Sequence, residues 1–245
     1  MMIQKKHWNG ALLLAGTASL LLLTASCLKS KFNPNNLGGN TPQAGVLFIH
    51  AAAGLSPVDV YGNNTLLNPA PMSYNGSTDR YVGLTPDYYT FKWDSSGTSK
   101  TIESVFESIP VNDLFTQFIY DSTDGAHRLA TIPDIVVGTS LVLSNFRFID
   151  LCPNVDRMQV YMGNSLVFSN RSFLDCNLNY NLDTFMTIQG GTNYPVTIKY
   201  VYQGDTLSNQ ATFYLNGGDI YTIFASGFAG AADSTRLTVG MAQNY

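Results

Sequence analysis

The residues best suited to chemistry are His50 and Asp59, on either side of a run of small side chains. Positions 46–61 read VLFIHAAAGLSPVDVY. An imidazole beside a carboxylate suits general-base catalysis, and imidazole also binds metals. No serine or cysteine in a nucleophile-elbow context completes a triad. We therefore expect His50 to hydrogen-bond a turn at a strand exit and its pairing with Asp59 to be a local hydrogen bond. We expect neither a catalytic set nor a metal site to form.

Tyr89 and Trp93 are the second chemical candidate, because aromatic rings can stack on sugars. They fall on one face of an expected strand, while Tyr88 points the other way. Packing into a core is the commoner outcome for such a pair. A glycan-binding platform requires their face to be exposed.

Cys27 directly follows an N-terminal segment with the layout of a bacterial lipoprotein leader. Lys5 and Lys6 precede an apolar run from 11 to 23, and small residues lead up to the cysteine. The run is shorter than the roughly 20 residues of a spanning helix. We expect residues 1–26 to be a signal peptide and Cys27 to carry the lipid that anchors the protein in the cell envelope, most simply at the outer membrane.

Residues 27–44 contain the lipidated cysteine and a segment rich in Asn, Pro and Gly. Such a composition buries too little apolar surface to fold, so we expect a flexible tether. Lys29 and Lys31 stand where some surface-displayed lipoproteins carry acidic residues. Surface display is therefore not indicated, and the periplasmic and surface faces both stay open.

Cys152 and Cys176 are the two thiols that remain after Cys27. Two cysteines in an exported domain favour a disulfide, which here would close a loop of about 25 residues. The alternative is two separate buried thiols that pack as small hydrophobic side chains.

The charge excludes nucleic acid as a partner. The 13 basic residues less Lys5 and Lys6 leave 11 against 17 acidic ones, so the mature chain has a formal charge of −6. Tyr, Phe, Thr, Asn and Gly are common, which favours β-strands joined by turns. An acidic chain without a basic run lacks the footprint of a nucleic-acid-binding protein. No cofactor is expected.

The chain contains a long internal repeat. Residues 48–66 resemble residues 148–166 at an offset of 100. Further equivalences align Thr90 and Lys92 with Thr197 and Lys199. Asp113, Phe115 and Thr116 align with Asp219, Tyr221 and Thr222, and Arg128-Leu129 with Arg236-Leu237. The growing offset predicts an insertion between Phe168 and Asn193. Copies of about 90 residues are too long for solenoid repeats, so they predict tandem domains.

Alternating strands and turns predict an all-β fold. Positions 196, 198, 200 and 202 are apolar or aromatic in alternation with their neighbours, and turn clusters recur every 8–12 residues. We expect two tandem β-sandwich domains of immunoglobulin or transthyretin-like type, with repeat 1 at 45–132, a linker at 133–139 and repeat 2 at 140–245.

The stretch 46–61 resembles the hallmark of a bacterial family of domains of unknown function. That hallmark is a hydrophobic strand, His-Ala-Ala-Pro-Gly, a few small residues and Val-Asp-Val-Tyr. Ala53 replaces the proline, and Asp150 replaces the histidine in the second copy. The resemblance implies tandem domains in exported envelope proteins, often lipoproteins, and no established activity.

These observations predict a non-catalytic cell-envelope lipoprotein that is held at the membrane by its N-terminal lipid and binds a glycan or an envelope protein. One alternative is an envelope hydrolase that uses His50 and Asp59 in an open cleft. The other is a structural spacer without a ligand.

Overall fold

The computed structural model describes residues 43–135, 138, 140–178 and 182–245. The predicted leader, Cys27 and the tether up to residue 42 lie outside these residues. Sixteen strands and one four-residue helix form within the described part.

Domain 1 contains the first eight strands. They are β1 (Ala44–Ala51), β2 (Val58–Gly62), β3 (Thr65–Leu66), β4 (Val82–Leu84), β5 (Asp87–Ser95), β6 (Thr101–Ile109), β7 (Leu114–Asp121) and β8 (His127–Pro133). Domain 2 contains the rest. They are β9 (Leu143–Leu151), β10 (Met158–Met162), β11 (Ser165–Arg171), α1 (Asp175–Leu178), β12 (Met186–Gln189), β13 (Thr192–Tyr202), β14 (Asp205–Leu215), β15 (Ile220–Ser226) and β16 (Thr238–Gln243).

Each domain is a sandwich of two four-stranded sheets, which confirms the predicted fold class. The inner sheets have the orders β4-β1-β7-β8 and β12-β9-β15-β16, and the outer sheets β3-β2-β5-β6 and β11-β10-β13-β14. β1 pairs in parallel with β7, and β9 with β15. Immunoglobulin domains place the first strand beside the second. Here the first strand of each domain lies beside the seventh, so of the two predicted types of sandwich only the transthyretin-like one remains.

The strand registers test the equivalences between the repeats. Val46 pairs with Phe115, and Phe146 pairs with Tyr221, which confirms the match of Phe115 with Tyr221. In domain 1, Val82 of β4 pairs with Val46 of β1. In domain 2, Met186 of β12 pairs with Phe146 of β9. The offset therefore rises from 100 to 104 between β11 and β12, within the predicted insertion.

Two of the predicted equivalences are wrong by two residues. Tyr61 pairs with Lys92, but Tyr161 pairs with Thr197, so Thr197 and not Lys199 is the counterpart of Lys92. Likewise Ile119 pairs with Leu129, and its counterpart Ala225 pairs with Val239 and not with Leu237. A shift of two residues keeps every side chain on its own face of the sheet. Similarity of sequence therefore cannot resolve it.

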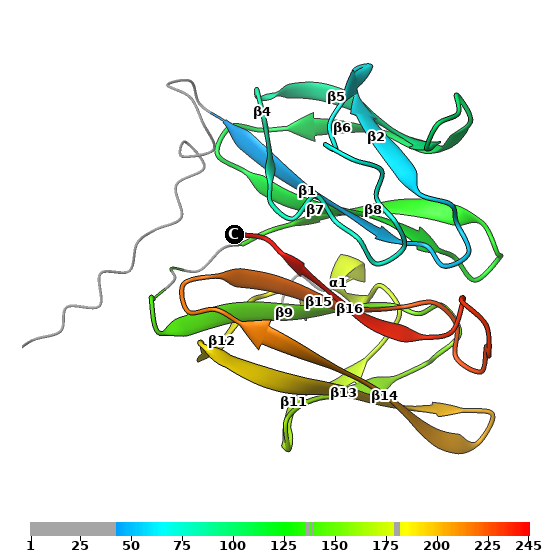
Figure 1. Ribbon diagram of the computed structural model, residues 1–245, viewed down its shortest axis with the longest axis vertical. Helices are drawn as coiled ribbons and strands as arrows, with labels where there is room; N and C mark the ends of the chain where they lie inside the picture. Colours follow the sequence, from blue (N-terminus) through cyan, green and yellow to red (C-terminus); the bar gives the residue numbers. More distant parts are fainter. Residues whose placement is uncertain (1–42, 136–137, 139, 179–181) are drawn as a thin grey trace, which may run out of the picture.

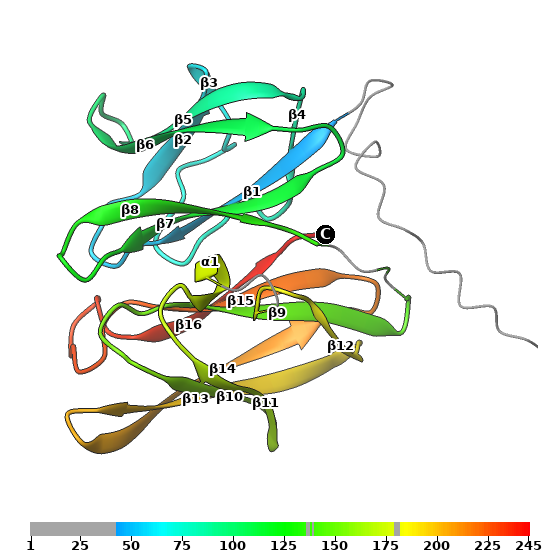
Figure 2. The ribbon, with the colours of Figure 1, turned by 180° about the vertical axis from the view of Figure 1, so that it is seen from behind.

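The two inner sheets face each other, and the molecule is a stack of four sheets (Figures 1 and 2). Strand β1 is buried along its whole length because it has two packed faces. Val46 and Phe48 enter the core of domain 1, whereas Leu47 and Ile49 enter a core shared with domain 2. Strands covered on both faces read as continuous apolar runs, as this one does.

Equivalent residues of the two domains meet across this shared core. The rings of Phe118 and Phe224 make an edge contact with centroids 6.1 Å apart. Both positions lie on the central strands β7 and β15, at the same place in the repeat. The two domains are therefore related by an approximate twofold arrangement, and each covers the apolar face that the other would expose.

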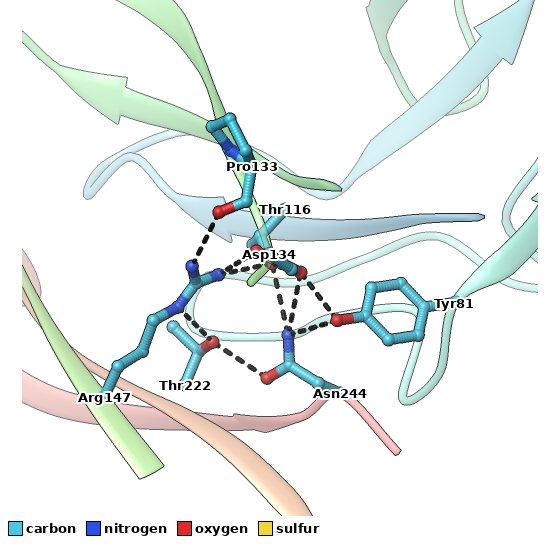
Figure 3. A network of polar contacts seen from close by, with 7 residues as sticks. All are labelled: Tyr81, Thr116, Pro133, Asp134, Arg147, Thr222 and Asn244. Carbon is cyan, nitrogen blue, oxygen red and sulfur yellow. Dashed lines mark hydrogen bonds and ion pairs between the residues drawn. The ribbon is translucent and has the colours of Figure 1, made fainter. Parts of the chain in front are cut away.

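A buried polar network lies beside these rings (Figure 3). Arg147 and Asp134 are both without exposed side-chain surface and form an ion pair of 2.5 Å across the interface. Arg147 also donates to Thr116 (2.7 Å) and to Thr222 (3.0 Å), which are equivalent residues. Asn244, the counterpart of Asp134, accepts from Thr222 and donates toward Asp134 at 3.2 Å. Position 47, equivalent to Arg147, holds leucine, so the network exists only once.

We expect Arg147→Leu to destabilise the protein by about 3–5 kcal/mol, because it leaves the carboxylate of Asp134 buried without its cation. Adding Asp134→Asn removes that charge and should recover part of the loss. Urea denaturation of the purified protein gives both values.

Arg128→Leu is the matched control. Arg128 forms an ion pair with Asp124 at 2.7 Å, but both side chains are about half exposed. Exposed pairs contribute about 0–1 kcal/mol. A loss for Arg147→Leu no larger than that of the control would contradict the role of the network.

Candidate functional site

His50 is fully buried at the end of β1, and its ring holds the turn that follows. Ala52 donates its backbone N–H to Nδ1 (3.3 Å), and Nε2 lies 3.4 Å from the carbonyl oxygen of Ser56. A ring that accepts at one nitrogen and donates from the other is neutral. Burial lowers the pKa of His50 from 6.5 to about 4. The ring therefore serves as a hydrogen-bonding support for the turn.

Asp150 does the same work at the equivalent position of domain 2. Its Oδ1 accepts the backbone N–H of Cys152 at 2.9 Å, as His50 accepts that of Ala52. Both side chains thus satisfy the amide two residues beyond them, where the chain leaves the sheet. Burial, followed by the nearby charge of Asp175, raises the pKa of Asp150 to about 7. The replacement of histidine by aspartate keeps an acceptor in place.

Asp59 is not brought to His50. Its Oδ1 accepts a hydrogen bond from Nδ2 of Asn68 at 3.2 Å. Asn68 in turn accepts the N–H of Val60 and donates to the carbonyl of Ala70, so this group secures the edge of β2. The predicted hydrogen bond between His50 and Asp59 is therefore wrong, because Asp59 is bonded by Asn68 and His50 by the turn.

Trp93 and Tyr89 face the core of domain 1, which is the outcome that the sequence favoured, so they do not form the alternative glycan-binding platform. Trp93 has no exposed surface, and its indole N–H donates to Oε1 of Gln117 at 2.8 Å. Tyr89 stacks on Phe91, with centroids 5.5 Å apart. Side chains alternate along β5, and the outer sheet has only one covered face. Tyr89, Phe91 and Trp93 therefore lie on that covered face and pack in the core of domain 1.

The exposed aromatic pair of domain 1 is Tyr88 with Phe106. Tyr88 is 61% exposed and Phe106 67% exposed, and their rings are parallel with centroids 5.5 Å apart. They come from neighbouring strands, since Thr90 pairs with Phe106 and Tyr88 pairs with Ser108. The sequence did place Tyr88 on the outward side. Phe106 could have been found as the aromatic residue on the polar face of an alternating strand.

Hydroxyl groups and one cation surround this pair on the outer face of domain 1. Lys92 lies over the ring of Tyr61 at 5.1 Å and forms an ion pair with Asp94 at 3.0 Å. Thr90 and Ser104 are exposed between Lys92 and the aromatic pair. This face offers rings for stacking and hydroxyl groups for hydrogen bonding.

Cys152 and Cys176 are separate buried thiols, so the prediction of a disulfide between them is wrong. Cys152 lies in the core of domain 2, whereas Cys176 lies in the core shared by the two domains. The inner sheet of domain 2 separates these two cores, so the two thiols lie in different layers of the molecule. Burial raises the pKa of Cys152 to about 12 and that of Cys176 to about 11. Both thiols are unreactive packing groups.

The described residues contain no group of three or more His, Cys, Asp or Glu side chains arranged to hold a metal ion. They also contain no helix long and apolar enough to cross a membrane. Cys27, the predicted lipidation site, lies outside them.

Comparison with known proteins gives few matches. No protein-family model matches the chain, and no curated protein matches it significantly. Among solved structures, it is similar to a CBM26 carbohydrate-binding module from Eubacterium rectale Amy13K in complex with maltoheptaose. The identity is 10%, the coverage 80% of this chain and 95% of that one, and the TM-score 0.24. A candidate cell adhesion protein from Bacteroides eggerthii gives 11% identity, coverage of 84% and 98%, and a TM-score of 0.22. Both TM-scores are too low to assign a shared fold or a function.

We expect His50 and Asp150 to impose opposite pH dependences on stability. Between pH 6.5 and 4 the unfolded chain protonates His50 while the folded protein does not, so the contribution of His50 falls as the pH falls. Between pH 3.8 and 7 the folded protein retains a proton on Asp150 that the unfolded chain has lost, so the contribution of Asp150 falls as the pH rises.

The variants His50→Asn and Asp150→Asn separate the two effects, because asparagine can still accept the turn amide. Relative to wild type, the free energy of unfolding of Asp150→Asn should rise between pH 4 and 7, and that of His50→Asn should fall. Differences from wild type that do not change with pH would contradict this assignment. Urea denaturation at a series of pH values measures them.

Proposed function

We propose that this protein is a non-catalytic, glycan-binding lipoprotein of the cell envelope, tethered by a lipid on Cys27, most simply at the outer membrane. The observation that carries the binding function is the exposed, stacked pair Tyr88–Phe106 on the hydroxyl-lined outer face of domain 1. The anchoring function rests on the leader and on the resemblance of residues 46–61 to tandem envelope domains.

The exposure of the pair supports a ligand. A single exposed apolar residue needs no explanation, but two large, exposed rings that stack on each other leave apolar surface in water. Sugars present apolar C–H faces ringed by hydroxyl groups. A sugar can therefore cover a ring face while its hydroxyl groups bond to side chains such as Thr90 and Ser104, both exposed nearby.

The hydrolase alternative loses the residues that motivated it. His50 is fully buried and engaged with the turn at 51–56, and Asp59 is engaged by Asn68. A general base must reach a proton on the substrate. The spacer alternative predicts a surface without an aromatic patch, which does not fit the outer face of domain 1.

We expect the double variant Tyr88→Ala, Phe106→Ala to bind at least tenfold more weakly to the polysaccharide that the wild type binds best, a change of about 1.4 kcal/mol. Affinity electrophoresis against neutral polysaccharides identifies that ligand, and calorimetry gives the affinities. The stability should change little, because both side chains are exposed.

Tyr214→Ala is the matched control. Tyr214 is 50% exposed on the outer sheet of domain 2 and should be dispensable for this ligand. Equal losses in the control and in the double variant would contradict a site at Tyr88–Phe106. Binding of an envelope protein and of no polysaccharide would replace the glycan with a protein partner.

Lipidation is tested in cells by incorporation of radiolabelled palmitate. We expect the wild type to be labelled and to fractionate with membranes, and Cys27→Ser to lose both properties, because an acylated cysteine provides the anchor. Labelling that persists in Cys27→Ser would contradict the assignment. Protease treatment of intact cells, with a tag after Tyr245, then distinguishes surface from periplasmic display.

A further inference from the structure

The outer face of domain 2 carries two hollows that share one lysine. The first, about 360 Å³ in volume, is lined by residues that include Arg157, Gln159 and Lys199. The second, about 450 Å³, includes Tyr161, Gln210 and again Lys199. Both lie over the strands β10, β13 and β14, in the lowest layer of Figure 1.

The charged residues that line these hollows, Lys199 and Arg157, are both basic. Lys199 and Arg157 are exposed, and neither forms an ion pair within the described residues. None of the residues that line either hollow carries a carboxylate. Both cations lie on the same outer face of a chain whose formal charge is −4. Lys92 of domain 1 is, by contrast, neutralised by Asp94.

The register shows that the two domains differ in charge at the same place. In domain 1, Asp59 of β2 lies opposite Asp94 of β5. In domain 2, the equivalent cross-strand pair is Gln159 with Lys199. Where the outer sheet of domain 1 has two acidic residues, that of domain 2 has an amide and a cation. In both domains a lysine lies over a tyrosine ring, Tyr61 in one and Tyr161 in the other.

The other groups around Lys199 indicate the chemistry of the ligand. The lysine is 4.6 Å from the centroid of Tyr161, and Thr197 donates to Gln210 at 3.1 Å beside it. Amide, hydroxyl and ring groups around a cation suit a sugar that bears a negative group. Two cations are too few for nucleic acid, whose binding depends on neutralising many phosphates.

We infer that the outer face of domain 2 is a second binding site, for an anionic saccharide, centred on Lys199 and Arg157. Lys199 and Arg157 take the negative groups, while Gln159 and Gln210 bond to hydroxyl groups. This site lies on a different sheet from Tyr88–Phe106 and does not depend on it.

The test uses the full mature chain with Cys27→Ser, so that it stays in solution. Calorimetry measures binding to polygalacturonate and to its methyl ester, which has the same backbone without the charge. We expect the acid to bind at least tenfold more tightly than the ester, and its affinity to fall as salt is raised. Heparin provides a second arm, in which the negative groups are sulfates.

Lys199→Gln and Arg157→Gln should each weaken binding of the acid about tenfold, because each removes a charge-assisted contact. Gln159→Asp, which restores the acid of domain 1, should weaken it too. Lys100→Gln removes an equal charge from an exposed turn of domain 1 and should leave the affinity unchanged. The variant Tyr88→Ala, Phe106→Ala should also leave it unchanged, so this inference and the proposed function can fail separately.

Binding of heparin alone through Lys199 supports the site, with sulfate as its group. The inference is overturned if neither acidic polysaccharide binds, if the ester binds as well as the acid, or if Lys199→Gln behaves like Lys100→Gln.

Discussion

Burial of the inner sheets on both faces is the constraint on which the rest of the molecule depends. One face of each inner sheet closes its own sandwich, and the other packs on the neighbouring domain around Phe118 and Phe224. Any polar side chain in the shared layer must therefore find its partner inside the protein. Arg147 does so with Asp134, and this buried ion pair helps to fix the orientation of one domain relative to the other. The two domains therefore form one stack of four sheets with a shared core.

The same constraint explains why the residues most suggestive of catalysis are structural. His50 and Asp150 stand at equivalent strand exits, where the chain leaves a sheet that is covered on both sides. An amide at such a place has no water to bond with and needs an acceptor from a side chain. Imidazole and carboxylate both meet that need. The two copies can therefore hold either residue without a change of fold, although burial lowers the pKa of His50 and raises that of Asp150.

The outer sheets are free of this constraint, because only one of their faces is covered. Their exposed faces differ between the domains in both ring content and charge. Domain 1 presents the rings of Tyr88 and Phe106, and domain 2 presents uncompensated positive charge at Lys199. A duplicated sandwich that fuses through its inner sheets thus leaves two independent surfaces available for recognition.

The all-β class, the duplication and the main site of insertion could be predicted from the sequence, because alternation and repetition are patterns in the order of the residues alone. The tertiary structure decided the register, since a shift of two residues preserves alternation and hides the difference between Thr197 and Lys199 as the counterpart of Lys92. It also decided that Trp93 is covered and Phe106 is exposed. Both belong to alternating strands, and only the packing of the second sheet and the second domain determines which face of a strand meets water.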